Sequence, residues 1–389
     1  MRIALPAALG LAVLGLLAAG FRSSPSRTAA APAPDLVKLL APCYAAGSDN
    51  AQALCLQRKI LAAAEASGDP GGLLPRVDRY AHAVGGILGA SCHILMHWVG
   101  RRYGQDEHVR LSDLMRLLPR SNDPGCSAGF THGLLISLGP QVEQLGPRGA
   151  AATCARAATR YERYSCVHGL GHAYMRLFGD VLAPALDACD RLGPEDAVDC
   201  AQGAYHDYWL SVGGADATAA HPGATTSPRA LCGAQPRADV RACWYRALLE
   251  APDTRSIDSA KGILGACSGL AGIQRSGCVT GASLVASADP FEQMRFCAAL
   301  SAPDARDCVR GVRAQALVGE GARQVALARG CAAYPGAARE ACAAWLGKAL
   351  AVVTNGRFGA SGCPALPAQL AAPCRRGAAA LNGPLETFS

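Results

Sequence analysis

The 389-residue chain has few charged residues and no charged run. Asp, Glu, Lys and Arg make up 17% of it, whereas hydrophobic residues make up 50%. This composition argues against disorder and supplies enough apolar surface for a sizeable core. The formal net charge is +7, but Lys and Arg are spread along the chain, so we expect no nucleic-acid partner.

Several common catalytic and cofactor motifs are also missing. The chain has no His-Glu-x-x-His, no Cys-x-x-Cys-His, no Gly-x-Ser-x-Gly and no phosphate-binding loop. These absences exclude the common zinc-protease arrangement, covalently attached haem, the hydrolase nucleophile elbow and a nucleotide cradle. The sequence therefore identifies no reaction, and whether the protein is an enzyme stays open.

The one long hydrophobic run lies at the N-terminus. Arg2 precedes an apolar run from Ile3 to Phe21, and a Ser/Pro/Ala-rich linker covers residues 22–35. We interpret residues 1–21 as a signal peptide or, alternatively, an uncleaved signal anchor, with Pro6 and the glycines favouring cleavage. We therefore expect an exported protein that is secreted, periplasmic or at the cell surface. It would contact a membrane only through this segment, if the segment is uncleaved.

Cysteine, in contrast, is abundant and regularly spaced. The chain has 18 cysteines, an even number, which in an exported protein favours disulfides over free thiols. Sixteen of them form pairs that are eleven or twelve residues apart. The pairs are Cys43/Cys55, Cys154/Cys166, Cys189/Cys200, Cys232/Cys243, Cys267/Cys278, Cys297/Cys308, Cys331/Cys342 and Cys363/Cys374.

The residues inside these pairs predict a tight helical hairpin. An apolar helical pattern from Val181 to Leu192 runs into Gly193-Pro194, which favours the end of one helix and the start of another. The first cysteine of a pair then lies in the last turn of one helix, and the second lies in the second or third turn of the next. In an antiparallel hairpin these positions can face each other at disulfide distance.

Aligning the second cysteines reveals a repeat. They are 30 to 43 residues apart, and Gly often follows three residues later, which indicates close contact between helices. Such a period predicts an all-α fold, an α-solenoid of about ten disulfide-stapled αα-hairpin repeats with helices of about 10–14 residues. The aligned cysteines are Cys55, Cys92, Cys126, Cys166, Cys200, Cys243, Cys278, Cys308, Cys342 and Cys374.

Two cysteines depart from the hairpin spacing. Cys92 and Cys126 hold the second-cysteine position, but neither has a cysteine eleven or twelve residues before it. Neighbouring repeats place equivalent helices side by side, so we expect Cys92 and Cys126 to pair with each other.

The layout resembles the Sel1-like and tetratricopeptide-type families of helical repeats, especially secreted cysteine-rich members. The resemblance covers residues 36 to about 380, concerns architecture only and carries over no functional residues. By analogy, such scaffolds bind partners. We divide the repeats into a histidine-containing part (36–210), a flexible insertion (211–230) and a histidine-free part (231–380).

All nine histidines lie between His82 and His221, and six of them closely follow an aligned cysteine. His132, His172 and His206 each fall six residues after it, which predicts a ladder on one face of the stack. Histidines at i and i+4 share a helix face, so each of two His-x-x-x-His motifs can chelate a metal ion. The six candidate ligands are His93, His97, His132, His168, His172 and His206.

The expected cofactor is a transition metal, Cu, Fe or Zn, because imidazole suits these ions and the cysteines are engaged in disulfides. Polar neighbours expected to support the ligands or to bind metal are Tyr164, Tyr205, Asp207 and Tyr208.

Three functions fit these residues. The first is an extracytoplasmic metalloprotein, with a metal-dependent oxidoreductase as its more specific form, and the second is metal storage or delivery. The third is a non-enzymatic solenoid that binds a protein, peptide or glycan at the cell surface, which the histidine-free half favours. Metal content separates the first two from the third.

Overall fold

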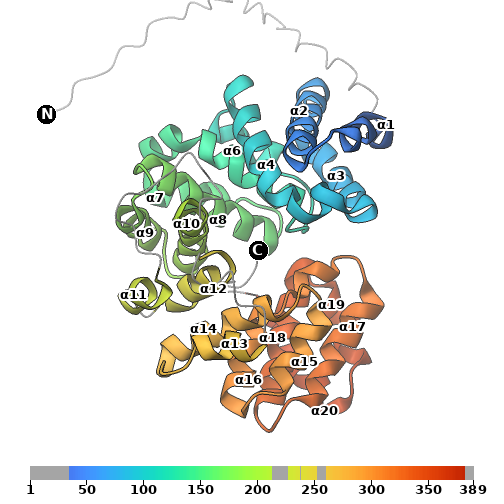
Figure 1. Cartoon of the computed structure of the whole chain (residues 1–389), viewed down its shortest axis with the longest axis vertical. Coiled ribbons are helices and arrows are strands. Elements are labelled where there is room, and N and C mark those ends of the chain that lie inside the picture. The colour runs from blue at the N-terminus through green and yellow to red at the C-terminus, as the bar shows by residue number, and fades with distance from the viewer. Residues whose placement is uncertain (1–34, 213–226, 237, 252–259, 382–389) are drawn as a thin grey trace, which may run out of the picture.

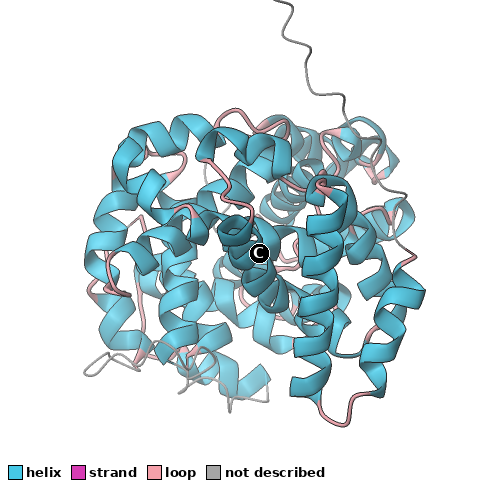
Figure 2. Cartoon of the chain, turned by 90° about the horizontal axis from the view of Figure 1, so that it is seen from above, coloured by secondary structure: helices cyan, strands magenta, loops and turns pink. Residues whose placement is uncertain are grey.

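The computed structural model describes residues 35–212, 227–236, 238–251 and 260–381, and every regular element among them is a helix. Figure 2 shows these helices joined by short loops. The all-α fold is therefore confirmed. The predicted signal segment and almost all of the linker lie outside the described residues; Asp35, the last linker residue, caps the first helix by accepting a hydrogen bond from Val37 N.

Ten even-numbered helices each carry one of the aligned cysteines, and we call them the cysteine row. Each contacts the next even-numbered helix, so the row is continuous along the chain, as in a solenoid. The row consists of α2 (Asp49–Ser67), α4 (Gly86–Asp106), α6 (Cys126–Ser137), α8 (Arg160–Leu177), α10 (Ala197–Val212), α12 (Val240–Glu250), α14 (Gly272–Ala286), α16 (Ala302–Cys308), α18 (Ala338–Val353) and α20 (Ala368–Ala379).

The odd-numbered helices and six 3-10 turns connect the members of the row. The connecting helices are α1 (Leu36–Leu40), α3 (Pro70–Val84), α5 (Leu114–Leu117), α7 (Gly139–Cys154), α9 (Leu182–Asp190), α11 (Pro228–Gly233), α13 (Ala260–Ala266), α15 (Pro290–Ala298), α17 (Gly321–Arg329) and α19 (Arg357–Ser361). The turns are η1 (Ala41–Ala45), η2 (Leu111–Asp113), η3 (Val309–Gly311), η4 (Ala314–Leu317), η5 (Gly330–Ala333) and η6 (Cys363–Ala365).

The expectation of uniform helices of about 10–14 residues is wrong. Helix lengths run from 4 residues in α5 to 21 residues in α4. The physical reason is that one turn is enough to place the first cysteine of a hairpin. Cys43, Cys331 and Cys363 lie in 3-10 turns and still form their disulfides.

All nine predicted disulfides are present, and the described residues include no free cysteine. In the eight hairpin disulfides, the second cysteine lies in the second turn of its helix. The exceptional bond, Cys92–Cys126, joins α4 to α6. Nine disulfides in one chain are typical of an oxidising, extracytoplasmic compartment.

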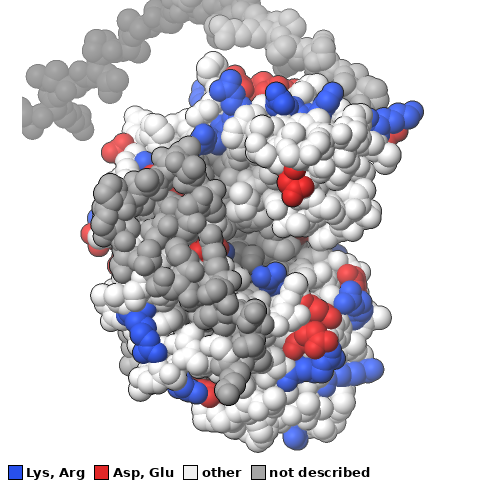
Figure 3. All heavy atoms as spheres, in the orientation of Figure 1, with Lys and Arg blue, Asp and Glu red and all other residues white. Residues whose placement is uncertain are grey.

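The row curves into an arc, which Figure 1 shows as the chain runs from blue through green to red. Its later part returns toward its earlier part: α18 contacts α8, and Asn122 Nδ2 donates a hydrogen bond to Val353 O at 2.9 Å. On the face in Figure 3, charged residues of both signs are scattered over a mostly uncharged surface. No helix in the described part of the chain is both long and apolar enough to span a membrane.

The predicted insertion at 211–230 overlaps two helices. Helix α10 continues to Val212, and α11 begins at Pro228. The residues between them that carry the Gly-, Ala- and Thr-rich stretch, 213–226, lie outside the described residues.

Glycines allow the helices of the row to touch backbone to backbone. A Cβ at Gly129 would overlap the carbonyl of His93, and one at Gly133 would overlap the carbonyl of His97. On the next pair of helices, a Cβ at Gly203 would overlap the carbonyl of His168. The recurring glycine therefore marks close helix contact, as predicted, and the contact points are backbone atoms of the histidine residues.

We expect Gly133→Ala to destabilise the protein by about 1–3 kcal/mol, because the added methyl group forces α6 away from α4. The matched control is Gly139→Ala in α7, where a Cβ would have no neighbour within 4 Å. The control should change the free energy of unfolding by no more than about 1 kcal/mol. Urea unfolding of both variants measures the difference, and equal stabilities would contradict close packing at Gly133.

Candidate metal centre

Four consecutive helices of the row bring all six candidate histidines together. Helix α4 contributes His93 and His97, and α6 contributes His132. The ring centroids of neighbouring members are 4.7 to 6.0 Å apart. We call this group the histidine cluster: His93, His97, His132, His168, His172 and His206.

The predicted ladder is present within the cluster. The ring centroid of His172 lies 5.1 Å from that of His132 on α6 and 5.0 Å from that of His206 on α10. Equivalent positions on helices in close contact therefore place their rings in one column. Within α8, His168 and His172 are one turn apart, and their centroids are 5.1 Å apart, as i and i+4 residues on one face should be.

The cluster is largely removed from water. His132, His168, His172 and His206 are at most 4% exposed. His93 and His97 are partly exposed residues, although their rings face the others. Desolvation is the largest cause that lowers the pKa of every member; it lowers the pKa of His93 to about 4 and those of the others well below the ordinary value. The imidazoles are therefore neutral at pH 7, the form that binds metal.

Three histidines are held through one ring nitrogen only. His93 Nδ1 lies 2.7 Å from Pro124 O, and His172 Nδ1 lies 3.2 Å from Asp207 Oδ1. His206 Nε2 lies 3.3 Å from Glu250 Oε1. A carbonyl or carboxylate oxygen only accepts, so the anchored nitrogen carries the proton and the opposite nitrogen keeps its lone pair. Metal-binding histidines in proteins are commonly supported in this way.

The opposite nitrogens have no hydrogen-bond partner. They are His93 Nε2, His172 Nε2 and His206 Nδ1, and each is buried. His168 has no partner for either of its ring nitrogens. Leaving a buried polar atom unsatisfied costs about 1–3 kcal/mol. Five such atoms lie together in this cluster, which makes it a candidate site for a metal ion.

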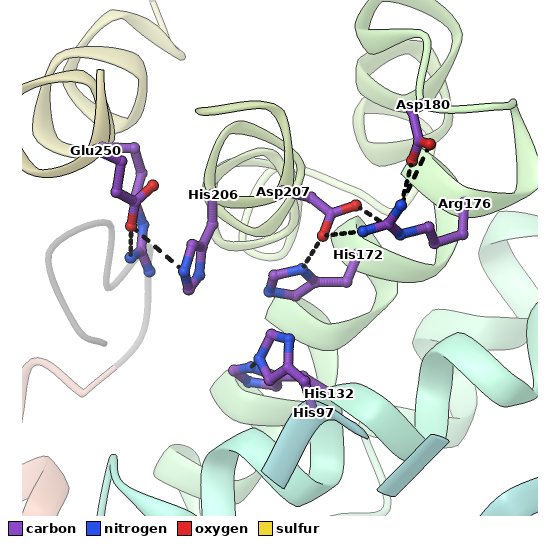
Figure 4. Close-up of polar contacts among 9 residues, drawn as sticks. His97, His132, His172, Arg176, Asp180, His206, Asp207 and Glu250 are labelled. Carbon is purple, nitrogen blue, oxygen red and sulfur yellow. Dashed lines mark hydrogen bonds and ion pairs between the residues drawn. The ribbon is translucent and has the colours of Figure 1, made fainter. Parts of the chain in front are cut away.

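Two arginine–carboxylate pairs flank the cluster. Arg176 Nε lies 3.2 Å from Asp207 Oδ2, and the same arginine pairs with Asp180, as Figure 4 shows. On the other side, Arg246 Nη1 lies 3.1 Å from Glu250 Oε1. Each carboxylate that supports a histidine is thus itself fixed and neutralised by an arginine.

Of the four predicted supporting residues, two contact the cluster. Asp207 accepts from His172, and the Tyr164 ring packs 5.7 Å from the ring of His168 while its hydroxyl donates to Gln202. Tyr205 instead donates to Gln235, and Tyr208 packs against Trp209. Successive residues of α10 point in directions 100° apart, so Tyr205 and Asp207 lie on opposite sides of His206, and Asp207 is on the side of His172.

Sequence reasoning missed Glu250, Arg246, Arg176 and the carbonyl of Pro124. One signal was available: Arg246 falls three residues after Cys243, where the repeats that contribute His132, His172 and His206 have Gly. The repeat that follows the last histidine therefore differs at the position of closest helix contact. Nothing in the sequence distinguished Pro124.

Two of the three remaining histidines, His82 and His108, lie outside the cluster. His82 Nε2 bonds Asp123 Oδ2 at 2.7 Å, and His108 is exposed on a different surface turn. His221 lies outside the described residues.

The cluster has donor spacing suited to a metal ion. Ligand atoms of two groups, His93/His97/His132 and His132/His168/His172, lie within 4.8 Å of one another. His132 Nδ1 and His97 Nε2 are 3.3 Å apart. Two ligands of a tetrahedral ion with bonds of about 2.0–2.1 Å are separated by about 3.3 Å. The arrangement can therefore hold a transition metal through neutral imidazoles.

The chain was compared with protein-family models, with curated proteins and with solved structures, and none of the three comparisons gave a match. The resemblance to Sel1-like and tetratricopeptide-type repeats accordingly stays an expectation.

The lowered pKa of His93 predicts how the metal-free protein responds to acid. The unfolded chain takes up a proton at this residue near pH 6.5, whereas the folded protein does so only near pH 4. The contribution of His93 to the free energy of unfolding is therefore fully present above pH 6.5. It decreases as the pH drops below 6.5, and about 3 kcal/mol is lost at pH 4. His93→Leu should remove this pH-dependent contribution. The free energy of unfolding of the variant should therefore fall less between pH 7 and 4 than that of the parent. Urea unfolding at several pH values tests this, and identical pH profiles would contradict it.

Proposed function

We propose that the protein binds transition-metal ions through its histidine cluster in an extracytoplasmic compartment. The observation that carries the proposal is the set of five buried ring nitrogens without a partner, three of them on imidazoles held from behind by a carbonyl or a carboxylate. The nine disulfides support secretion, a periplasmic location or display at the cell surface.

The donor set favours Cu, Fe or Zn. Imidazole nitrogen suits all three ions, whereas the cluster offers no thiolate, because every cysteine is in a disulfide. The two supporting carboxylates, Asp207 and Glu250, are each paired with an arginine. They contact His172 Nδ1 and His206 Nε2, the ring nitrogens that are not the candidate ligand atoms. They therefore orient these imidazoles and raise their basicity as ligands.

This proposal has two more specific forms. One is a metal-dependent oxidoreductase, and the other is a protein that stores or delivers the metal. Each candidate group supplies three imidazoles. Three protein ligands are typical of reactive sites, which keep one position for water or substrate. This ligand number favours a reactive centre. Binding of azide to the copper- or iron-loaded protein, seen as a change in its visible spectrum, supports it; a spectrum indifferent to azide favours storage.

His168→Ala and His172→Ala should each lower the metal affinity of the group His132/His168/His172 at least 100-fold, by the loss of a ligand. Asp207→Asn should lower it about 10–100-fold, because the amide orients His172 less well. Metal per chain is measured after equilibrium dialysis against Cu, Fe or Zn of known free concentration, with the protein oxidised.

The matched control is His108→Asn, an exposed histidine outside the cluster at φ 48°, a conformation that Asn tolerates. It should bind metal like the parent. All variants should retain nine disulfides by non-reducing peptide mapping. Metal content and affinity equal to those of the parent in both His168→Ala and His172→Ala would overturn the proposal.

A second candidate function is the binding of a peptide, protein or glycan, and a cavity of about 700 Å³ favours it. The cavity lies between α12, α16, α18 and α20 and is lined by Arg241, Arg306, Arg310 and Lys348, with no carboxylate among the described lining residues. Trp345 also lines it, and the buried indole Nε1 has no hydrogen-bond partner. These groups suit an anionic ligand, and we propose an acidic peptide.

A glutamate-rich decapeptide should bind the metal-free and metal-loaded protein equally. Arg310→Glu should weaken this binding at least tenfold, whereas Arg357→Glu, an exposed site on α19 that does not line the cavity, should leave it unchanged. Isothermal titration measures both. Equal weakening by the two variants would show unspecific charge attraction and remove this candidate.

A further inference from the structure

His132 occupies a special place in the histidine cluster because it belongs to both candidate groups. One group joins it to His93 and His97 of α4, and the other joins it to His168 and His172 of α8. Helix α6 lies between these helices and contacts both. Each outer helix thus supplies two imidazoles, and the middle helix supplies one that both groups share.

The two ring nitrogens of His132 face different helices. Nδ1 lies 3.3 Å from His97 Nε2 on α4. Nε2 lies 3.4 Å from Ser165 Oγ on α8, one turn before His168. The ring centroid of His132 lies 4.7 Å from that of His168 and 5.0 Å from that of His93. One ring nitrogen of His132 therefore faces each of the two outer helices.

A single ion cannot be bound by both ring nitrogens of His132, because the two lone pairs point in different directions. An imidazole that binds an ion at each nitrogen, with bonds of about 2 Å, holds the two ions about 6 Å apart. The ligand atoms of each group lie within 4.8 Å of one another, so the ion on each side of His132 has two further imidazoles within reach. We infer that His132 bridges two metal ions, one held with His93 and His97 and the other with His168 and His172.

The bridge also helps to balance charge. To bind an ion at both nitrogens, His132 gives up its remaining ring proton to solvent and becomes an imidazolate with one negative charge. The carboxylates of Asp207 and Glu250 are already paired with Arg176 and Arg246. The imidazolate therefore places a negative charge between the two cations, where no other side chain of the cluster does so.

His206 is placed to complete either coordination shell. Its ring centroid lies 5.0 Å from that of His172 in one group and 5.7 Å from that of His93 in the other. Glu250 fixes its Nε2, which leaves the buried Nδ1 as the ligand atom.

This inference rests on the proposed metal binding, and copper loading separates the two. The parent protein should bind two Cu(II) ions per chain, and exchange coupling through the bridge should remove the ordinary single-ion electron paramagnetic resonance signal. His93→Ala and His168→Ala each spoil one group, so each should bind one Cu(II) with an uncoupled signal. His132→Gln, which offers one donor atom instead of two, should also lose the coupling.

The control His108→Asn should bind two coupled ions. A parent protein that saturates at one Cu(II), or binds two ions with no coupling, would overturn the bridge while leaving metal binding intact. A parent that binds none would overturn the proposed function itself. Peptide mapping of the disulfides shows that each variant is folded before it is loaded.

Discussion

Backbone contact between neighbouring helices of the cysteine row is the constraint on which the rest of the structure depends. At the positions of Gly129, Gly133 and Gly203, the facing atoms are the carbonyls of His93, His97 and His168. A side chain at these glycines would separate the helices by at least the width of a methyl group. Because the contact occurs at the histidine residues themselves, the imidazoles on adjacent helices converge instead of lying on separate surfaces.

The disulfides and the glycines have complementary roles. Hairpin disulfides join each first cysteine to the next helix of the row, but only Cys92–Cys126 joins two members of the row directly. That bond lies between α4 and α6, one residue before His93 and six before His132. It fixes the register of the two helices on which the cluster begins. At the end of the cluster beyond His206, Arg246 stands where the three preceding repeats have the recurring glycine. Arg246 pairs with Glu250, which in turn contacts His206.

The sequence predicted the parts of this arrangement that depend on register. Constant cysteine spacing predicted the eight hairpin disulfides, and equivalent positions in neighbouring repeats predicted Cys92–Cys126. Constant offsets from the aligned cysteines predicted that His132, His172 and His206 stack. It did not predict helix lengths, because a single turn suffices to place a cysteine. The sequence also did not predict which way the side chains next to a candidate ligand point around their helix. Asp207 faces His172, whereas Tyr205 bonds Gln235, although both are adjacent to His206 in the chain.

X-ray absorption at the metal edge of the loaded protein tests the central claim most directly, because it reports the atoms bound to the metal. A metal held by the histidine cluster should be surrounded by nitrogen and oxygen at about 2.0–2.1 Å, with the multiple-scattering pattern of several imidazoles. Sulfur at about 2.3 Å would show that cysteine binds the metal, and a shell without imidazole scattering would place the metal elsewhere. Either result would contradict the account.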